Sequence, residues 1–178
     1  MSTICNMDKG SIRVINSNFT NDGCSIDNTE GFVFISNSIF KNSKSDSIVN
    51  LDNMKITGST FTNNKAMDGY GVINNQGIMT ISNSKFTNNR GKFSGAIGNW
   101  DLSLTIRNSI FTNNIAKKYG GAISNGVYYS HGTLKVINTK FKNNLVGKTY
   151  KAIYSCKESK FTKSKVTITP KDNTKIKK

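Results

Sequence analysis

The sequence predicts an all-β fold, a parallel β-helix of about six to seven coils, and three observations carry this prediction. A motif of two apolar residues spaced by one, followed by Ser and Phe, recurs along the chain, as between Leu104 and Phe111. The phenylalanines of successive copies lie 21, 21, 25, 25 and 30 residues apart. A repeat of this length indicates a solenoid, and the alternation of apolar and polar residues within each copy indicates strands.

Each copy is expected to contain three short strands separated by turns. The strands end at Asn, Asn-Asn or Gly, which favour turns because they tolerate unusual backbone angles or bond their own backbone. Three strands per copy cannot form hairpins, because equivalent strands would then lie far apart. Stacked as coils, each strand pairs in parallel with its copy in the next coil, about 4.8 Å away. We therefore expect one domain over residues 1–170 and a basic tail over residues 171–178.

Stacking places equivalent residues in columns. The phenylalanines are expected to form an aromatic column inside the coils, at Phe19, Phe40, Phe61, Phe86, Phe111 and Phe141. The asparagine two residues after each aromatic is expected to form an amide ladder that holds the turns, at Asn21, Asn42, Asn63, Asn88, Asn113 and Asn143. A second series pairs an Ile with an Asn two residues later, as at Ile123 and Asn125, and a last, worn copy of the first strand is expected at Val166. We interpret these asparagines as structural.

The amino-acid composition bears on whether the chain is disordered, spans a membrane or binds a polyanion. Hydrophobic residues make up 35% of the chain, which is low enough for disorder to be considered, but their regular register favours a folded chain. Because there is no run of about 18 apolar residues, we expect no membrane span. The formal net charge is +15, and twelve lysines lie beyond Lys135. This charge reflects either a composition rich in Lys, Asn and Ile or a polyanion-binding end; nucleic acid is not the expected partner.

Two short motifs resemble those of a known group of repeat proteins. Phe-Thr-Asn-Asn occurs at residues 61–64, 86–89 and 111–114, and Gly-Gly-Ala-Ile occurs at residues 120–123. Together they resemble the repeats of polymorphic outer-membrane autotransporters and of adhesin-like surface proteins of methanogenic archaea, over residues 4–170. The resemblance implies a right-handed, pectate-lyase-like β-helix and a non-enzymatic role at the cell surface or outside the cell.

As a member of that group, the chain would be a rigid adhesion module. Its expected partners are a host or neighbouring cell surface, a glycan or a cell-wall polymer, and it would continue into further repeats of a longer parent chain. No signal peptide opens the sequence, so export is implied by the resemblance alone.

Acidic residues recur at one turn position in the first three coils. Asp8, Glu30 and Asp52 each follow the Asn of an Ile-x-Asn segment by two residues, so stacking would place them about 5 Å apart. Carboxylates this close raise each other's pKa or recruit a cation, which makes the column a candidate Ca²⁺ site; otherwise these are exposed turn residues. The alternative function is therefore a carbohydrate-active or carbohydrate-binding β-helix, similar to polysaccharide lyases, although the sequence leans against an enzyme and no other cofactor is expected.

Aromatic residues in turns are the candidate recognition residues. The insertion over residues 126–132 carries Tyr128, Tyr129 and His131, and His131 is the sole histidine. Insertions into single repeats often carry the function of a solenoid, although a plain surface loop is the alternative interpretation. Trp100, in a similar turn, is expected to be exposed and able to stack on a sugar ring. A third hypothesis places polyanion binding at the lysine-rich C-terminal end.

Overall fold

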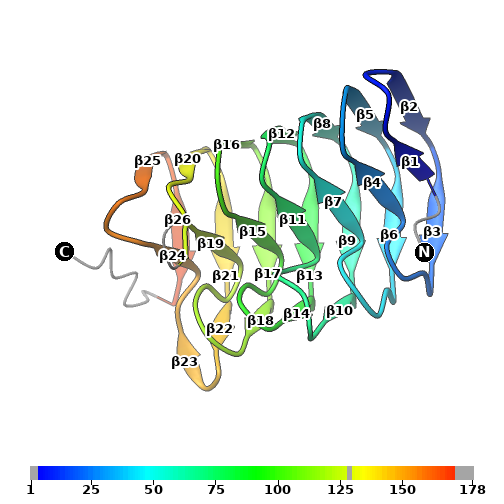
Figure 1. Ribbon diagram of the computed structural model, residues 1–178. Helices are drawn as coiled ribbons and strands as arrows, with labels where there is room; N and C mark the ends of the chain where they lie inside the picture. Colours follow the sequence, from blue (N-terminus) through cyan, green and yellow to red (C-terminus); the bar gives the residue numbers. More distant parts are fainter. Residues whose placement is uncertain (1–3, 128–129, 171–178) are drawn as a thin grey trace.

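The computed structural model describes residues 4–127 and 130–170. Within these ranges the chain forms strands β1 to β26 and no helix, and the strands wind into a rod of seven coils (Figure 1). Equivalent strands of successive coils stack into four sheets, here named A to D, and sheets A, B and C each contain seven strands. The parallel β-helix predicted from the repeat is therefore confirmed.

Sheet A contains the Ile-x-Asn segments. Its strands pair in parallel, with each Ile opposite the Ile of the next coil, as Ile73 is opposite Ile97. Each of these isoleucines from the second coil onward is buried, because alternate residues of a strand point to the same face. The strands of sheet A are β1 (Ile4–Asn6), β4 (Ile26–Asn28), β7 (Ile48–Asn50), β11 (Ile73–Asn75), β15 (Ile97–Asn99), β19 (Ile123–Asn125) and β24 (Ile153–Ser155).

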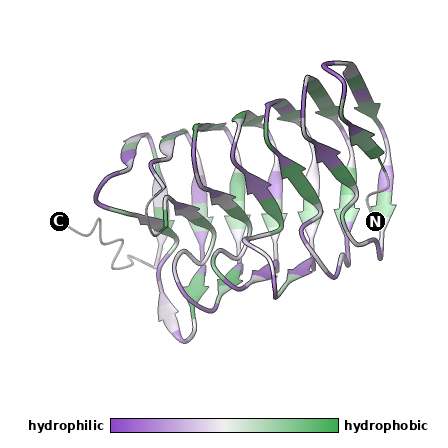
Figure 2. Cartoon of the chain, in the orientation of Figure 1, coloured by the Kyte–Doolittle hydropathy of each residue, from purple (hydrophilic) through white to green (hydrophobic). Residues whose placement is uncertain are grey.

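Sheet B carries the apolar pairs of the repeat on its inner face. Met79 and Ile81 of β12, for example, are 1% and 0% exposed, and the residues between them point outward. Hydrophobic and hydrophilic residues thus alternate along the strands, and the turns are mostly hydrophilic (Figure 2). The strands of sheet B are β2 (Ser11–Ile15), β5 (Phe32–Ser36), β8 (Asn53–Thr57), β12 (Ile78–Ser82), β16 (Ser103–Arg107), β20 (Thr133–Ile137) and β25 (Lys160–Ser164).

Sheet C contains the aromatic column, which forms as predicted. Neighbouring phenylalanine rings stack with centroids 4.6 to 4.9 Å apart from Phe19 to Phe141. This distance matches the spacing of neighbouring strands. The strands of sheet C are β3 (Asn18–Thr20), β6 (Ile39–Lys41), β9 (Thr60–Thr62), β13 (Lys85–Thr87), β17 (Ile110–Thr112), β21 (Lys140–Lys142) and β26 (Thr167–Thr169).

The small residue two positions before each ring also has a role. The backbone N–H of Ser59 donates to the hydroxyl of Ser84 at 3.2 Å, and the hydroxyl of Ser59 donates to the carbonyl of Thr57 at 3.0 Å. The same pair of bonds recurs at Ser38 and Ser84. A hydroxyl at this position therefore satisfies the backbone of the turn between sheets B and C.

Sheet D was not predicted from the sequence. It begins at the third coil, where the spacing between phenylalanines lengthens from 21 to 25 residues, so the extra residues form a fourth short strand. Its last pair, β22 and β23, is antiparallel. The strands of sheet D are β10 (Lys65–Ala66), β14 (Arg90–Gly91), β18 (Ile115–Ala116), β22 (Leu145–Val146) and β23 (Thr149–Tyr150).

The hydrogen-bonded amide ladder in this part of the coil lies one residue later than expected. The side chain of Asn64 donates to Asn89 at 3.0 Å, Asn89 to Asn114 at 3.0 Å, and Asn114 to Asn144 at 2.9 Å. The predicted residues, Asn63, Asn88, Asn113 and Asn143, instead hold the turn through positive φ angles of 53° to 57°. A side chain at the turn residue points out of the coil, so only the following residue reaches the interior.

A second amide ladder runs through the Ile-x-Asn series. Successive side-chain bonds of 2.7 to 2.9 Å link these asparagines along sheet A. Ser155 closes the series by accepting a bond from Asn125 at 3.0 Å. The column runs through Asn6, Asn28, Asn50, Asn75, Asn99 and Asn125.

The register expected for the last coil was wrong. Phe161 of β25 pairs with Leu134, and Ile168 of β26 pairs with Phe141. The first strand of the last coil is therefore β25, and Val166 does not begin it. Ile168 stands in the phenylalanine column, and the loss of the usual Phe at this position hid the alignment.

Candidate binding groove

A groove runs along the stack at the corner where each coil turns out of sheet C. Its volume is about 730 Å³. One side is a column of five asparagines, here called the corner asparagines: Asn21, Asn42, Asn63, Asn88 and Asn113. The other side is a column of cations, here called the basic column: Lys44, Lys65 and Arg90. Since one corner asparagine comes from each of the first five coils, the groove follows the long axis of the rod.

The corner asparagines are placed by the backbone. Their φ angles lie between 56° and 60°, in the left-handed region, which Asn tolerates better than most residues. All five are exposed, and the described part of the chain offers no hydrogen-bond partner to the side chains of Asn42, Asn63 and Asn88. Their amides therefore remain available as donors and acceptors for a ligand.

The wall behind the corner is rigid. The side chain of Asn64 donates to the carbonyl of Phe40 at 3.1 Å as well as to Asn89, and its backbone N–H donates to Asn89 at 3.1 Å. Asn89 and Asn114 repeat these contacts. Because these amides are buried and satisfied, they fix the spacing of the coils at the groove.

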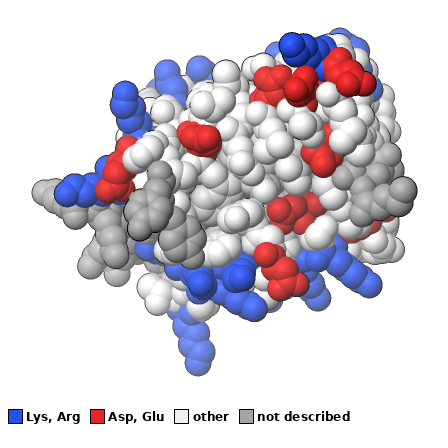
Figure 3. Space-filling model, viewed as in Figure 1, with Lys and Arg blue, Asp and Glu red and all other residues white. Residues whose placement is uncertain are grey.

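The groove is positively charged. Lys65 and Arg90 are register partners in β10 and β14, and Lys44 lies at the equivalent position one coil earlier, since Ser43 and Asn64 occupy the same ladder position. No carboxylate lines the groove, and within residues 4–127 and 130–170 none of the three cations forms an ion pair. Figure 3 shows basic side chains along the lower edge of the molecule, near β10, β14 and β18.

One sequence pattern indicates the basic column of this groove. A cation follows the Asn-Asn pair directly in Phe-Thr-Asn-Asn-Lys (residues 61–65) and Phe-Thr-Asn-Asn-Arg (residues 86–90). In a stacked fold, recurrence at one repeat position implies a column of charge. The candidate binding residues predicted from the sequence were instead mainly acidic and aromatic residues of the turns.

Trp100 is not the exposed aromatic that was expected. It is 8% exposed and packs with Phe93 and Val127 in a small apolar cluster outside the main core. Gly98 makes this possible, because a Cβ atom there would meet the indole ring at 2.5 Å. Tyr70 covers the indole with ring centroids 4.8 Å apart. Stacking on a sugar ring by Trp100 would require the cluster to open.

The other predicted recognition residues lie in the insertion that follows β19. His131 is exposed, and Tyr128 and Tyr129 lie outside the described residues. A hollow of about 190 Å³ beside this insertion is lined by Tyr70, Gln76, Trp100, Val127 and Ser130. It is about a quarter of the volume of the groove.

The acidic residues of the first three coils lie at the turn that follows sheet A. Asp8 and Glu30 are exposed, and Asp52 is half-buried. The carboxylate of Asp52 accepts from the backbone of Gly31 at 2.7 Å and from the side chain of Asn53 at 2.6 Å. Among the described residues, no three His, Cys, Asp or Glu side chains are placed to hold a metal ion together. Calcium binding at Asp8, Glu30 and Asp52 gains no support from this geometry.

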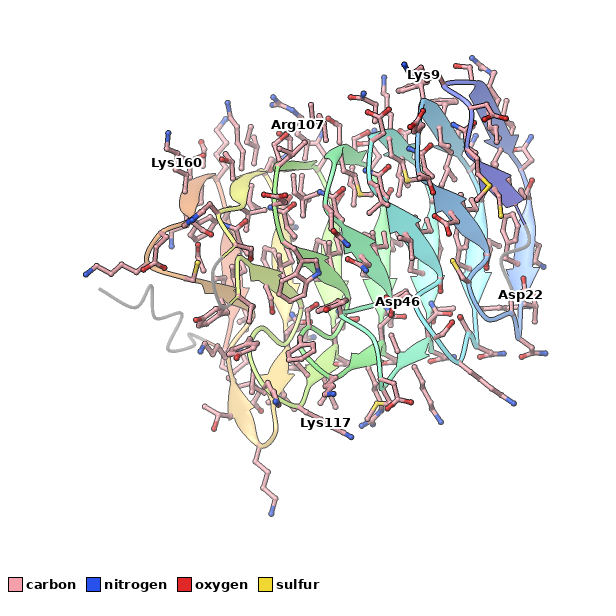
Figure 4. The ribbon with its side chains drawn as sticks, in the orientation of Figure 1. Lys9, Asp22, Asp46, Arg107, Lys117 and Lys160 are labelled. Carbon is pink, nitrogen blue, oxygen red and sulfur yellow. The ribbon has the colours of Figure 1, made fainter. Side chains whose placement is uncertain are left out.

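Asp46 is a titratable residue that the sequence did not single out. Burial raises the pKa of its carboxyl to about 6, although the nearby polar groups of Tyr70, Gly71 and Asn74 act in the opposite direction. Asp46 and Asp68 line a cavity of about 310 Å³ together with Lys44. Figure 4 labels Asp46 between β7 and β10.

Comparisons with protein-family models, with curated proteins and with solved structures find no match. The resemblance to autotransporter and adhesin-like repeats therefore stays a prediction. In the described part of the chain, no helix is long and apolar enough to cross a membrane.

Proposed function

We propose that this chain is a non-enzymatic β-helix module of an adhesin-like protein at the cell surface, and that it holds an extended glycan or cell-wall polymer. The observation that carries the proposal is the groove, which presents equivalent side chains from five successive coils. A straight and periodic groove suits a straight and periodic ligand, because each unit of the polymer meets a similar set of donors and acceptors.

The rigidity of the wall supports the same function. Asn64, Asn89 and Asn114 are fully buried and hydrogen-bonded on both sides. A preformed site loses little conformational freedom when a ligand binds, which favours affinity. Unpaired amides at Asn63 and Asn88 can then exchange water for the hydroxyl groups of a sugar.

The proposal is tested by measuring how affinity depends on the length of the ligand. We expect the purified protein to bind oligosaccharides of increasing length with increasing affinity, until the oligomer is about 20 Å long, which is the distance from the first to the fifth coil at about 4.8 Å per step. The measurement is isothermal titration calorimetry with a size series from one polysaccharide. Affinity that is the same for a disaccharide and a long oligomer would contradict an extended site.

One observation favours a second candidate, a carbohydrate-active enzyme. Asp46 has a pKa near 6 and shares a cavity with Asp68, and two carboxylates in different environments are the usual acid and base of glycoside hydrolysis. An enzyme would release reducing ends from a polysaccharide, and both Asp46→Asn and Asp68→Asn would abolish the release. Binding without turnover favours the adhesin-like module.

A further inference from the structure

We infer that the groove selects an acidic polysaccharide, whose carboxylate or sulfate groups bind to Lys44, Lys65 and Arg90 while its hydroxyl groups bind to the corner asparagines. This inference rests on the proposed function and names the ligand class of the same site. It differs from polyanion binding at the C-terminal end, because the three cations lie in the second to fourth coils.

The basic column is the first reason. Three cations stand on consecutive coils, about 4.8 Å apart from one coil to the next, and no carboxylate is among the described residues that line the groove. Like charges at this spacing repel each other. A chain of anionic groups that lies along the column removes this repulsion, whereas a neutral glycan leaves it in place.

The pairing of charge with amides is the second reason. Each cation is preceded by a corner asparagine two residues earlier, as Asn63 precedes Lys65 and Asn88 precedes Arg90. An Asn side chain is both donor and acceptor, so it matches a hydroxyl group, and a neighbouring cation matches an acidic group. Acidic sugars carry both kinds of group on one ring.

The lining also argues against single-stranded nucleic acid. Sites for single strands combine positive charge with aromatic side chains on which the bases stack. None of the described residues that line this groove is aromatic, and the outward-facing side chains of β9 and β13 beside it are Thr and Lys residues. Bases would have no surface for stacking here.

The experiment compares polygalacturonate with its fully methyl-esterified form, which keeps the sugar backbone and removes the charge. The full chain and two triple variants are titrated by calorimetry at low ionic strength. The groove variant is Lys44→Gln, Lys65→Gln, Arg90→Gln. The matched control is Lys55→Gln, Lys135→Gln, Arg13→Gln, which removes the same charges from the exposed face of sheet B.

We expect polygalacturonate to bind, the esterified polymer to bind at least about tenfold more weakly, and the groove variant to lose about tenfold in affinity while the control loses less than about threefold. The loss should shrink as salt is added, because exposed charges are screened. Thermal melts of the three proteins should coincide, which separates lost binding from lost folding.

The remaining outcomes overturn the inference in distinguishable ways. Equal binding of both polymers would reject the acidic ligand and leave the glycan-binding function in place. Equal losses in both triple variants would reject the groove in favour of net charge alone. Tighter binding of an oligothymidylate at the same ionic strength would assign the groove to nucleic acid, and no binding of either polymer would contradict both the inference and the proposed function.

Discussion

At the scale of the residue, one amino acid has three different roles in this chain. Asn63 has a left-handed φ of 57° and is exposed in the groove. Asn64 is fully buried and bonds to Asn89 in the next coil. Asn75 is fully buried at the end of β11 and bonds to Asn99. The direction of the side chain relative to the coil decides which role each takes, because the inward amides of Asn64 and Asn75 meet their copies in the next coil.

The negative charge of the half-buried Asp46 carboxylate destabilises the folded chain. Its pKa rises from 3.8 to about 6 in the folded chain, so the folded state binds a proton that the unfolded state has released between these two values. Stability therefore falls as the pH rises from about 4 to about 6 and then levels off. We expect Asp46→Asn to be more stable than the parent chain at pH 7 by about 1 to 3 kcal/mol, and the difference to vanish near pH 4.

Denaturant unfolding at pH 4, 5, 6 and 7 measures this difference. Asp68→Asn is the control, because it makes the same change of charge at an exposed position in the same cavity. A variant Asp46→Asn that is less stable than the parent at pH 7 would show that the polar groups around the carboxylate outweigh its burial.

At the scale of the element, the amide ladders stabilise corners where the backbone leaves a sheet. The side chain of Asn89 accepts two hydrogen bonds from Asn64 and donates to the carbonyl of Phe61 and to Asn114. Removing it leaves several buried groups without partners. The neighbouring Asn88 is exposed and contributes chiefly its tolerance of a positive φ.

Substitution of each asparagine by glycine distinguishes the contributions of Asn88 and Asn89 to stability. We expect Asn89→Gly to lower the free energy of unfolding by about 2 to 5 kcal/mol, since buried polar groups lose their partners. Asn88→Gly should change it by less than about 1 kcal/mol, because glycine adopts a positive φ without strain. Urea unfolding followed by circular dichroism provides the comparison, and equal effects would show that both asparagines act only through the backbone.

At the scale of the whole molecule, the stability of each coil depends on its packing against the neighbouring coils. Each coil contacts its neighbours only, so a solenoid behaves as a one-dimensional array. The core residues Ile56 and Ile81 of the central coils are 0% exposed, whereas Phe19 and Phe161 at the two ends are only partly buried. The central coils should therefore be the last part to open.

Hydrogen exchange tests this order. We expect the backbone amides of β8, β12 and β16 to exchange most slowly and those of β2 and β25 to exchange fastest, because local opening needs less free energy where fewer apolar contacts are lost. Mass spectrometry of peptide fragments resolves the coils. Uniform protection along the rod would indicate that all seven coils unfold as one cooperative unit.

The fold was predictable because the same pattern of residues recurs in successive copies of the repeat. Period-two alternation, a Phe at a spacing of 21 to 30 residues and a turn residue after each strand leave stacked coils as the consistent solution. The same logic identified the aromatic column and the Ile-x-Asn column. The prediction failed for the last coil, whose first strand was expected to begin at Val166. Ile168 stands there in place of the usual Phe, and the alignment of the repeats depends on that Phe.

The groove was harder to predict than the fold. Asn63 and Lys65 are two residues apart, but whether they face one groove or opposite sides depends on the angle of the corner between them. The same is true of Trp100, which was expected in solvent and is covered by Phe93, Val127 and Tyr70. The pattern within one copy indicates which residues form a column, but it does not tell on which side of a corner that column lies.

The sequence by itself determined the repeat, the three main strands of each coil, the aromatic and Ile-x-Asn columns and the positive charge, since each of these follows from spacing and composition along one chain. The tertiary structure alone decided which asparagines are buried, where the fourth sheet begins and which cations line a common groove. The physical reason is that burial and proximity depend on the direction of side chains at the corners of a coil. Residues from coils about 25 positions apart in the chain meet there.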